Sequence, residues 1–262
     1  MSNNQINQKD IFLGKKIFNI YIMNYIYINS GDLSSGTIEN GDYILHNAIE
    51  NKNYIKLLNF HCTNTFYNVN ANNNNLTFFD TSATTTYNIT ITEGNYDISS
   101  LIFTIETELN NSASSLVFNV TYNTNTMKVT ISASGGFALY FNADNQINKL
   151  IGFSSNATSS DTTHTGENVV DLNYPKNILL TIREFGIEYN NSNNNNINLH
   201  TYNIPVNVNG SDIITYNEKY MFKQMANIKE KTIKRLNIVL RDENGNQLDL
   251  NGGNYQIIFY VI

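Results

Sequence analysis

Residues that could bind a metal are present in this sequence, but their spacing does not suit a metal site. The four histidines, His46, His61, His164 and His200, are far apart and form none of the short pairs that hold an ion. A metal site of the cupin kind needs two close histidines followed by a carboxylate. Cys62 is the sole cysteine, so neither a thiolate metal site nor an internal disulfide is expected. We therefore predict no metal and no other cofactor.

Two pairs of carboxylates could carry out the acid–base hydrolysis of glycosides. Glu106 and Glu108 are two residues apart on a predicted helix, so their side chains point away from each other. Glu184 and Glu188 flank the end of a predicted strand, where solvated carboxylates are ordinary. The chain has no Trp for a sugar platform, although its 17 tyrosines could supply one. We predict that the protein is not an enzyme and has no catalytic residues; hydrolysis by Glu184 and Glu188 is the alternative.

Three tyrosines near the N-terminus are candidates for an interface. Tyr21, Tyr25 and Tyr27 recur within a short apolar segment. Tyrosine is enriched where a surface is half apolar and half wet, which is typical of contacts between proteins. The same residues also suit a strand on a half-buried sheet. Both interpretations stay open from the sequence, and we name these three as possible interface residues.

The charge of the chain argues against a nucleic-acid partner, and the length of its longest apolar run argues against a membrane span. The net charge of −6 and the pI near 5.2 do not provide the basic face that nucleic-acid binding requires. The apolar run 17–28 is interrupted by Asn19 and Asn24 and is shorter than the roughly 20 residues that span a bilayer. We therefore expect no nucleic-acid partner and no membrane span.

The elements that would position these residues are almost all strands. Short apolar segments alternate with polar residues and are separated by turns, which predicts an all-β chain. The hairpin around residues 123–125 is the clearest of these, and the last strand is apolar on both faces, which indicates an interior position. The strand candidates are 43–46, 54–61, 76–79, 87–92, 116–122, 127–131, 137–141, 178–185, 202–208, 232–241 and 255–262.

One helix interrupts this pattern. Asp97 can cap its first turn, and five apolar residues then recur at helical spacing. A lone buried helix between hairpins must cover an opening in a sandwich or barrel, so we expect it to cap the sandwich. The residues predicted to face the core are Ile98, Leu101, Ile102, Ile105 and Leu109.

Several segments together resemble the small jelly-roll capsid proteins of the adenovirus-like viral lineage, which include the pentons and minor capsid proteins of virophages, polinton-like viruses and giant DNA viruses. Each segment is weak alone, but their order and spacing are specific, and the resemblance covers about residues 25–262. The segments that carry it are 27–30, 35–36, 43–45, 54–58, 67–69, 76–79, 91–96, 147–153, 236–242 and 248–252.

The resemblance implies a single jelly-roll β-sandwich of about eight main strands with insertions. We expect a flexible N-terminal arm over residues 1–24 and one jelly-roll capsid domain over 25–262. The implied function is that of a penton-like vertex capsomer in the virion of an icosahedral double-stranded DNA virus, made in the host cytoplasm. Its implied partners are itself, as a homopentamer, the major capsid protein and other minor capsid proteins. The alternatives are a minor capsid or cement protein, or a carbohydrate-binding module of a virion spike.

Overall fold

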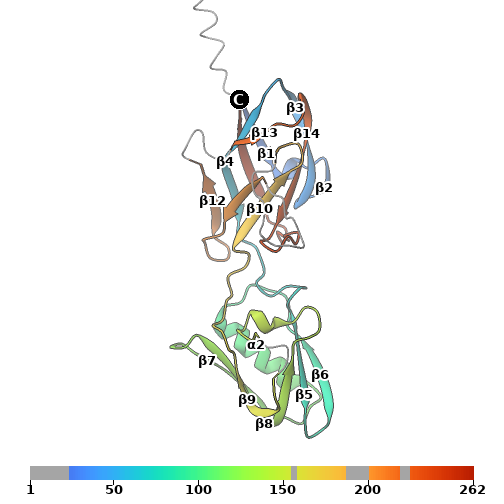
Figure 1. Ribbon diagram of the computed structural model, residues 1–262, viewed down its shortest axis with the longest axis vertical. Coiled ribbons are helices and arrows are strands. Elements are labelled where there is room, and N and C mark those ends of the chain that lie inside the picture. The colour runs from blue at the N-terminus through green and yellow to red at the C-terminus, as the bar shows by residue number, and fades with distance from the viewer. Residues whose placement is uncertain (1–23, 155–157, 187–200, 219–224) are drawn as a thin grey trace, which may run out of the picture. The chain divides into compact units, whose positions relative to one another are not determined.

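The chain folds into two compact units, and each is described by itself. The computed structural model describes residues 24–154, 158–186, 201–218 and 225–262. The first unit takes its residues from Met1–Asn64 and Asn177–Ile262, and the second is Thr65–Lys176 (Figure 1). This differs from the single domain expected over 25–262, because the chain completes a second hydrophobic core before it returns to the first. Of the expected arm, only Asn24 belongs to the described residues.

The first unit is a sandwich of two antiparallel sheets. One sheet has the order β1-β15-β4-β12, with short β13 also pairing with β4, and the other has the order β11-β10-β14-β3-β2. The strands of the first sheet are β1 (Asn24–Asn29), β15 (Tyr255–Val261), β4 (Tyr54–Thr63), β12 (Ile213–Asn217) and β13 (Met225–Asn227). Those of the second are β11 (Tyr202–Pro205), β10 (Asn177–Ile182), β14 (Thr232–Arg241), β3 (Asn40–Glu50) and β2 (Ser35–Thr37).

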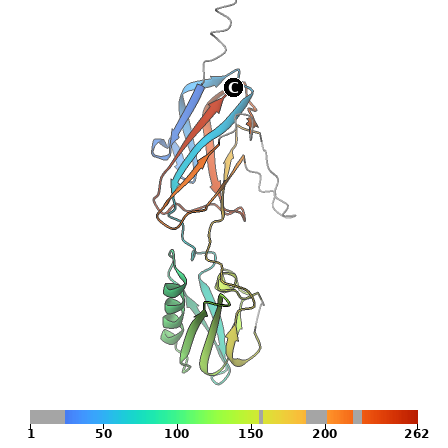
Figure 2. The ribbon, with the colours of Figure 1, turned by 90° about the vertical axis from the view of Figure 1, so that its left-hand side faces the viewer.

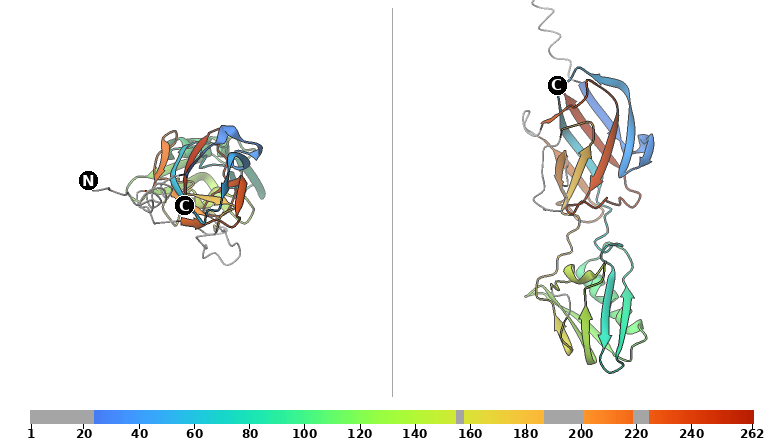
Figure 3. Two further views of the ribbon diagram at one scale, coloured as in Figure 1. Left: turned by 90° about the horizontal axis from the view of Figure 1, so that it is seen from above. Right: turned by 45° about the vertical axis from the view of Figure 1, so that its right-hand side comes forward.

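The order of the strands in these two sheets defines a jelly roll. Without the three-residue strands β2 and β13, eight strands are left among the described residues of this unit. Counted along the chain from one to eight, they lie in the orders 1-8-3-6 and 5-4-7-2, which is the jelly-roll arrangement of two interlocked Greek keys. Figure 3 shows the blue first strand and the dark red last strand of this roll, which pair with each other. The predicted jelly-roll sandwich is therefore confirmed.

Aromatic residues fill the core of the jelly roll. Tyr255 at the start of β15 packs in a stack on Phe60 of β4, with ring centroids 6.0 Å apart. The hydroxyl groups of Tyr43 and Tyr255 are 2.8 Å apart and form a buried hydrogen bond, which satisfies both polar tips inside the core. Strand β15 lies between β1 and β4, so the interior position predicted for the last strand is confirmed.

The second unit is a sheet with one helix along it. Its sheet has the order β6-β5-β8-β7, and β9 also pairs with β8. The predicted hairpin is formed by β7 and the first half of β8, while the second half of β8 pairs with β5. The elements are β5 (Asn75–Asp80), β6 (Thr85–Thr90), α2 (Ile98–Asn111), β7 (Phe118–Asn123), β8 (Lys128–Tyr140) and β9 (Asp161–Thr165). The described residues also form two 3-10 turns, η2 (Ser30–Asp32) in the first unit and η3 (Ile147–Lys149) in the second.

Helix α2 forms where the sequence predicts it. The Asp97 carboxylate accepts a hydrogen bond of 2.7 Å from the Ser100 N–H and so caps the first turn. Leu101, Ile105 and Leu109 are fully buried, and Ile98 and Ile102 are partly buried against the same core. That core belongs to the second unit, however, and Figure 2 shows α2 lying along this unit's sheet. The expectation that the helix caps the jelly-roll sandwich is therefore corrected.

Candidate interaction surface

Two of the three predicted interface tyrosines lie on strand β1, at the end of a sheet. The side chains of β1 alternate, so that Ile28 is buried while Tyr25 and Tyr27 are 57% and 54% exposed. The ring of Tyr25 lies 5.8 Å from that of Tyr260 on the neighbouring strand β15. Tyr21 lies outside the described residues. Strand β1 therefore presents aromatic side chains to solvent beside an edge of the jelly roll.

Strand β3 borders the same side of the jelly roll and carries a long bulge. Strand β2 pairs only with its first residues, up to Asp42. The pairing of β3 with β14 shifts register. Four residues of β3, Leu45–Ala48, therefore lie opposite the single residue Lys234 and have no Cα partners in β14. Bulges of this kind interrupt the backbone ladder and bend the strand. The second half of β3 is therefore an irregular edge.

A groove runs between these two strands. Its two adjoining parts have volumes of about 400 Å³ and 320 Å³, and both are lined by Tyr25, Ile26 and Asn47. Ile44 of β3 also lines the groove and is 71% exposed. The groove therefore combines two strand edges with exposed apolar side chains.

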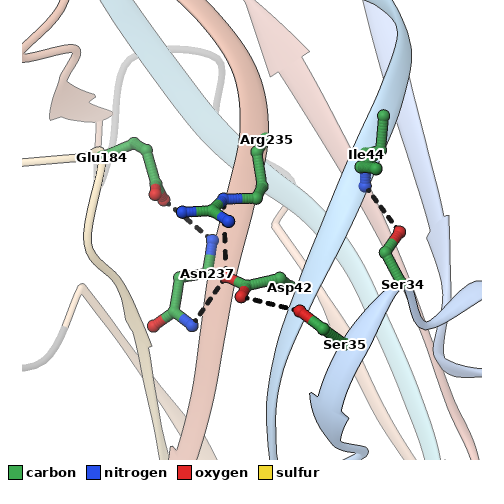
Figure 4. Close-up of polar contacts among 7 residues, drawn as sticks. All are labelled: Ser34, Ser35, Asp42, Ile44, Glu184, Arg235 and Asn237. Atoms are coloured by element: carbon green, nitrogen blue, oxygen red, sulfur yellow. Dashed lines mark hydrogen bonds and ion pairs between the residues drawn. The ribbon is translucent and has the colours of Figure 1, made fainter.

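A row of polar side chains crosses the outer face of the sheet that contains β3 (Figure 4). The Glu184 carboxylate accepts from the backbone N–H of Asn237 at 3.0 Å. The Asn237 side chain donates to Asp42 at 3.0 Å, and the Ser35 hydroxyl donates to the other oxygen of the same carboxylate at 3.0 Å. The Arg235 Nε is 3.8 Å from Asp42. These bonds tie β14, β3 and β2 together outside the core.

The pKa values of the two carboxylates in this row, Asp42 and Glu184, are shifted in opposite directions. The hydrogen bond from Asn237 lowers the pKa of Asp42, and the bond from Ser35 and the positive charge of Arg235 act in the same direction. Burial raises the pKa of Glu184, because a half-buried carboxylate loses hydration when it ionises. Glu188, its predicted partner, lies outside the described residues. Glu184 is thus engaged with the backbone of β14, and this explains its presence in structural terms.

A second sheet edge, at β7 in the other unit, is covered by helix α2. Asn110 accepts from the Phe118 N–H at 2.8 Å and donates to the carbonyl oxygen of the same residue at 2.9 Å. The Glu106 carboxylate accepts from the Val120 N–H at 2.8 Å. These groups point away from β8 and would otherwise be open to a further strand. Sequence reasoning considered Glu106 only as a catalytic candidate and missed this role.

The remaining candidate histidines that are described lie on different strands. His46 lines the groove, and His61 lies near Thr215, with 3.3 Å between the ring Nδ1 and the hydroxyl. His164 belongs to the second unit, where its ring Nε2 lies 2.8 Å from the Phe137 carbonyl oxygen. Burial raises the pKa of the Cys62 thiol to about 12, which leaves it protonated. His200 lies outside the described residues.

The described part of the chain also contains neither metal-binding groups nor membrane-spanning helices. No group of three or more His, Cys, Asp or Glu residues there is arranged to hold a metal ion. Within the same residues, no helix has the length and apolar character needed to cross a membrane.

Comparison with known proteins gave matches among solved structures. No protein-family model matches the chain, and no curated protein matches it. The mavirus penton protein is similar at 12% identity and a TM-score of 0.48, covering 91% of this chain and 99% of that one. A chain from the cryo-EM structure of the Sputnik virophage is similar at 14% identity and a TM-score of 0.40, covering 91% and 98%. Both are virophage proteins, the kind that the sequence motifs resemble.

Proposed function

We propose that this protein is a structural protein of a virion, with no enzymatic activity. The observation that carries the proposal is the jelly-roll strand order of the first unit, in which β1-β15-β4-β12 faces β11-β10-β14-β3. Viral capsid proteins, lectins and cupins share this architecture. The sequence motifs favour the capsid proteins among them. The cupin alternative would need a metal site, and the described residues contain no group of three or more His, Cys, Asp or Glu that could hold a metal ion.

Within the virion, we assign the protein to a penton-like vertex capsomer. A ring of five copies needs heterologous contacts, in which one surface of each copy binds a different surface of the next. The exposed tyrosines of β1 and the groove beside β3 offer a surface for such a contact. The low charge of the chain reduces repulsion between copies. Its partners are then further copies, the major capsid protein and other minor capsid proteins, after synthesis in the host cytoplasm.

Size-exclusion chromatography with light scattering, followed by electron microscopy of the purified full chain, tests this assignment. We expect a pentamer with fivefold symmetry in averaged particle images. Threefold particles, or density away from the vertices in images of virions, would instead support a minor capsid or cement protein. A protein that stays monomeric at high concentration and binds a glycan array would support the carbohydrate-binding alternative and contradict the capsomer.

A further inference from the structure

We propose that the groove between β1 and β3 binds an extended strand from a second copy of this chain, formed by residues 17–23. The inference rests on the proposed function, because it names a contact by which copies of a capsomer associate. It assigns different roles to two parts of the chain. The groove of each copy receives a strand, and the segment before β1 of each copy is donated.

The geometry of the groove suits an added strand. Strand β1 ends its sheet among the described strands and pairs with β15 along Asn24–Asn29. On the other side of the groove, β2 pairs only with Asn40–Asp42, so among the described strands the edge of β3 that faces the groove is unpaired beyond Asp42. An edge strand offers a row of backbone donors and acceptors to an incoming chain. The six residues of β1 match the length of a typical strand, so a seven-residue segment is long enough to pair with it.

The side chains around the groove indicate an apolar occupant. Tyr27 is 54% exposed and Ile44 is 71% exposed, and both line the groove. Residues 17–23 have the sequence Ile-Phe-Asn-Ile-Tyr-Ile-Met. In an extended chain, Phe18, Ile20 and Ile22 lie on one face. That face would cover the apolar lining of the groove, while Asn19 and Tyr21 would face away.

The position of residues 17–23 in the chain favours pairing with another copy over pairing with β1 of the same copy. Residues 17–23 run directly into β1, and a chain must reverse through a turn before it can pair with the strand that follows. The stretch from Lys15 to Ser30 contains neither Gly nor Pro, and Asn24, which could also favour a turn at this junction, is paired with Val261 as part of β1. Seven extended residues span roughly 23 Å. Since the donated segment and the groove are different surfaces, each copy can donate and receive at once, and the contact can close into a ring.

Two full-length double variants separate the two roles. The donor variant carries Ile20→Asp with Ile22→Asp, and the acceptor variant carries Tyr27→Asp with Ile44→Asp. A control, Val117→Asp with Met127→Asp, places the same added charge on two exposed apolar residues of the second unit. Each variant is studied alone and in equimolar mixture by light scattering and analytical ultracentrifugation.

We expect the wild-type chain and the control to form the same oligomer. The donor and acceptor variants alone should be monomers, with association weakened at least about tenfold. Their mixture should form a 1:1 dimer, because the intact segment of the acceptor variant can still bind the intact groove of the donor variant. Formation of that dimer also shows that both variants are folded.

The outcomes separate this inference from the proposed function. If both variants form the wild-type oligomer, or if their mixture stays monomeric, the strand-donation contact is wrong. If those same variants still give fivefold particles, the capsomer assignment stands without it. If the wild-type chain is monomeric under all conditions, both the contact and the capsomer are contradicted.

Discussion

The sheet edge at β1 and the sheet edge at β7 differ in how their exposed backbone is treated. At β7, Glu106 and Asn110 of α2 make three hydrogen bonds to the outward-facing groups of Phe118 and Val120. At β1, the neighbouring groove is lined by exposed Tyr27 and Ile44. Proteins commonly cover or charge an edge strand to prevent pairing with other chains. The edge at β7 follows that rule, whereas among the described residues the edge at β1 does not, which supports the contact that we propose at β1.

The largest effect is expected from removing the packing of α2. Changing Ile105→Ala deletes fully buried methyl and methylene groups and should lower the free energy of unfolding of the second unit by about 2–5 kcal/mol. Urea denaturation followed by circular dichroism measures the change. The matched control is Phe103→Ala on the exposed side of the helix, where the loss should stay within about 0.5 kcal/mol. Equal losses would show that the helix is not held by its buried stripe.

Removing the side chains that bond to the edge of β7 should have the next largest effect on stability. The double variant Glu106→Ala with Asn110→Ala removes three hydrogen bonds from the edge and should cost roughly 2 kcal/mol. It should also increase aggregation, since the freed backbone groups can accept another strand. Chemical denaturation and static light scattering report the two effects. Glu108→Ala serves as the control, and similar behaviour of both variants would contradict the capping role of Glu106 and Asn110.

Glu184 and Asp42, the two carboxylates of the polar row, should contribute to folding stability with opposite pH dependences. The folded protein has a raised pKa at Glu184, so its stabilisation is present below the ordinary value of 4.5 and is lost as the pH rises through the folded pKa. Glu184→Gln should therefore be more stable than the wild type at pH 7, and the difference should shrink on acidification. Thermal unfolding across pH 3–8 measures it.

Asp42 should show the reverse behaviour. Its pKa is lowered in the folded protein, so its stabilisation is present above the ordinary value of 3.8 and is lost as the pH falls through the folded pKa. Asp42→Asn should therefore be less stable than the wild type at pH 7, by a margin that narrows in acid. The same thermal unfolding series tests both variants, and parallel pH profiles for the two would refute the opposite assignments.

The smallest effect on stability is expected from charging the β1 edge. Tyr27→Lys changes an exposed side chain and should alter the free energy of unfolding by less than about 0.5 kcal/mol. It should nevertheless weaken self-association, because a lysine on an edge strand opposes pairing. Light scattering at several concentrations, with Tyr67→Lys in the second unit as the control, distinguishes a contact surface from a merely exposed tyrosine.

The sequence predicted the local elements better than their grouping. The helix from Ile98, its cap at Asp97 and the hairpin after Phe118 follow from spacing and turn chemistry, and the structure confirms them. The division at Asn64 and Thr65 was not predicted, because strands on both sides have the same composition and alternation. Strand β9 was missed since its sequence, Asp-Thr-Thr-His-Thr, contains no apolar alternation.

The candidate surface was predicted only in part. Tyr25 and Tyr27 were named from the clustering of tyrosines, and the structure places them at an edge. The bulge of β3 could not be foreseen, because it depends on the register with β14, which is distant in the sequence. The role of Glu106 was hidden for a similar reason, since its partner Val120 lies 14 residues away on a strand.

The pairing of the first and last strands of the jelly roll has a consequence for biosynthesis. Asn24 of β1 lies opposite Val261 of β15, so the ladder between these strands cannot form until nearly the whole described chain has left the ribosome. Residues 65–176 are contiguous and can fold during translation, as domains generally do. During that interval β2 and β3 can pair with each other, but β1, β4 and the β14 side of β3 lack their partners in the nascent chain. The time needed to translate the inserted unit is therefore a delay during which these strand edges stay unpaired in the nascent chain.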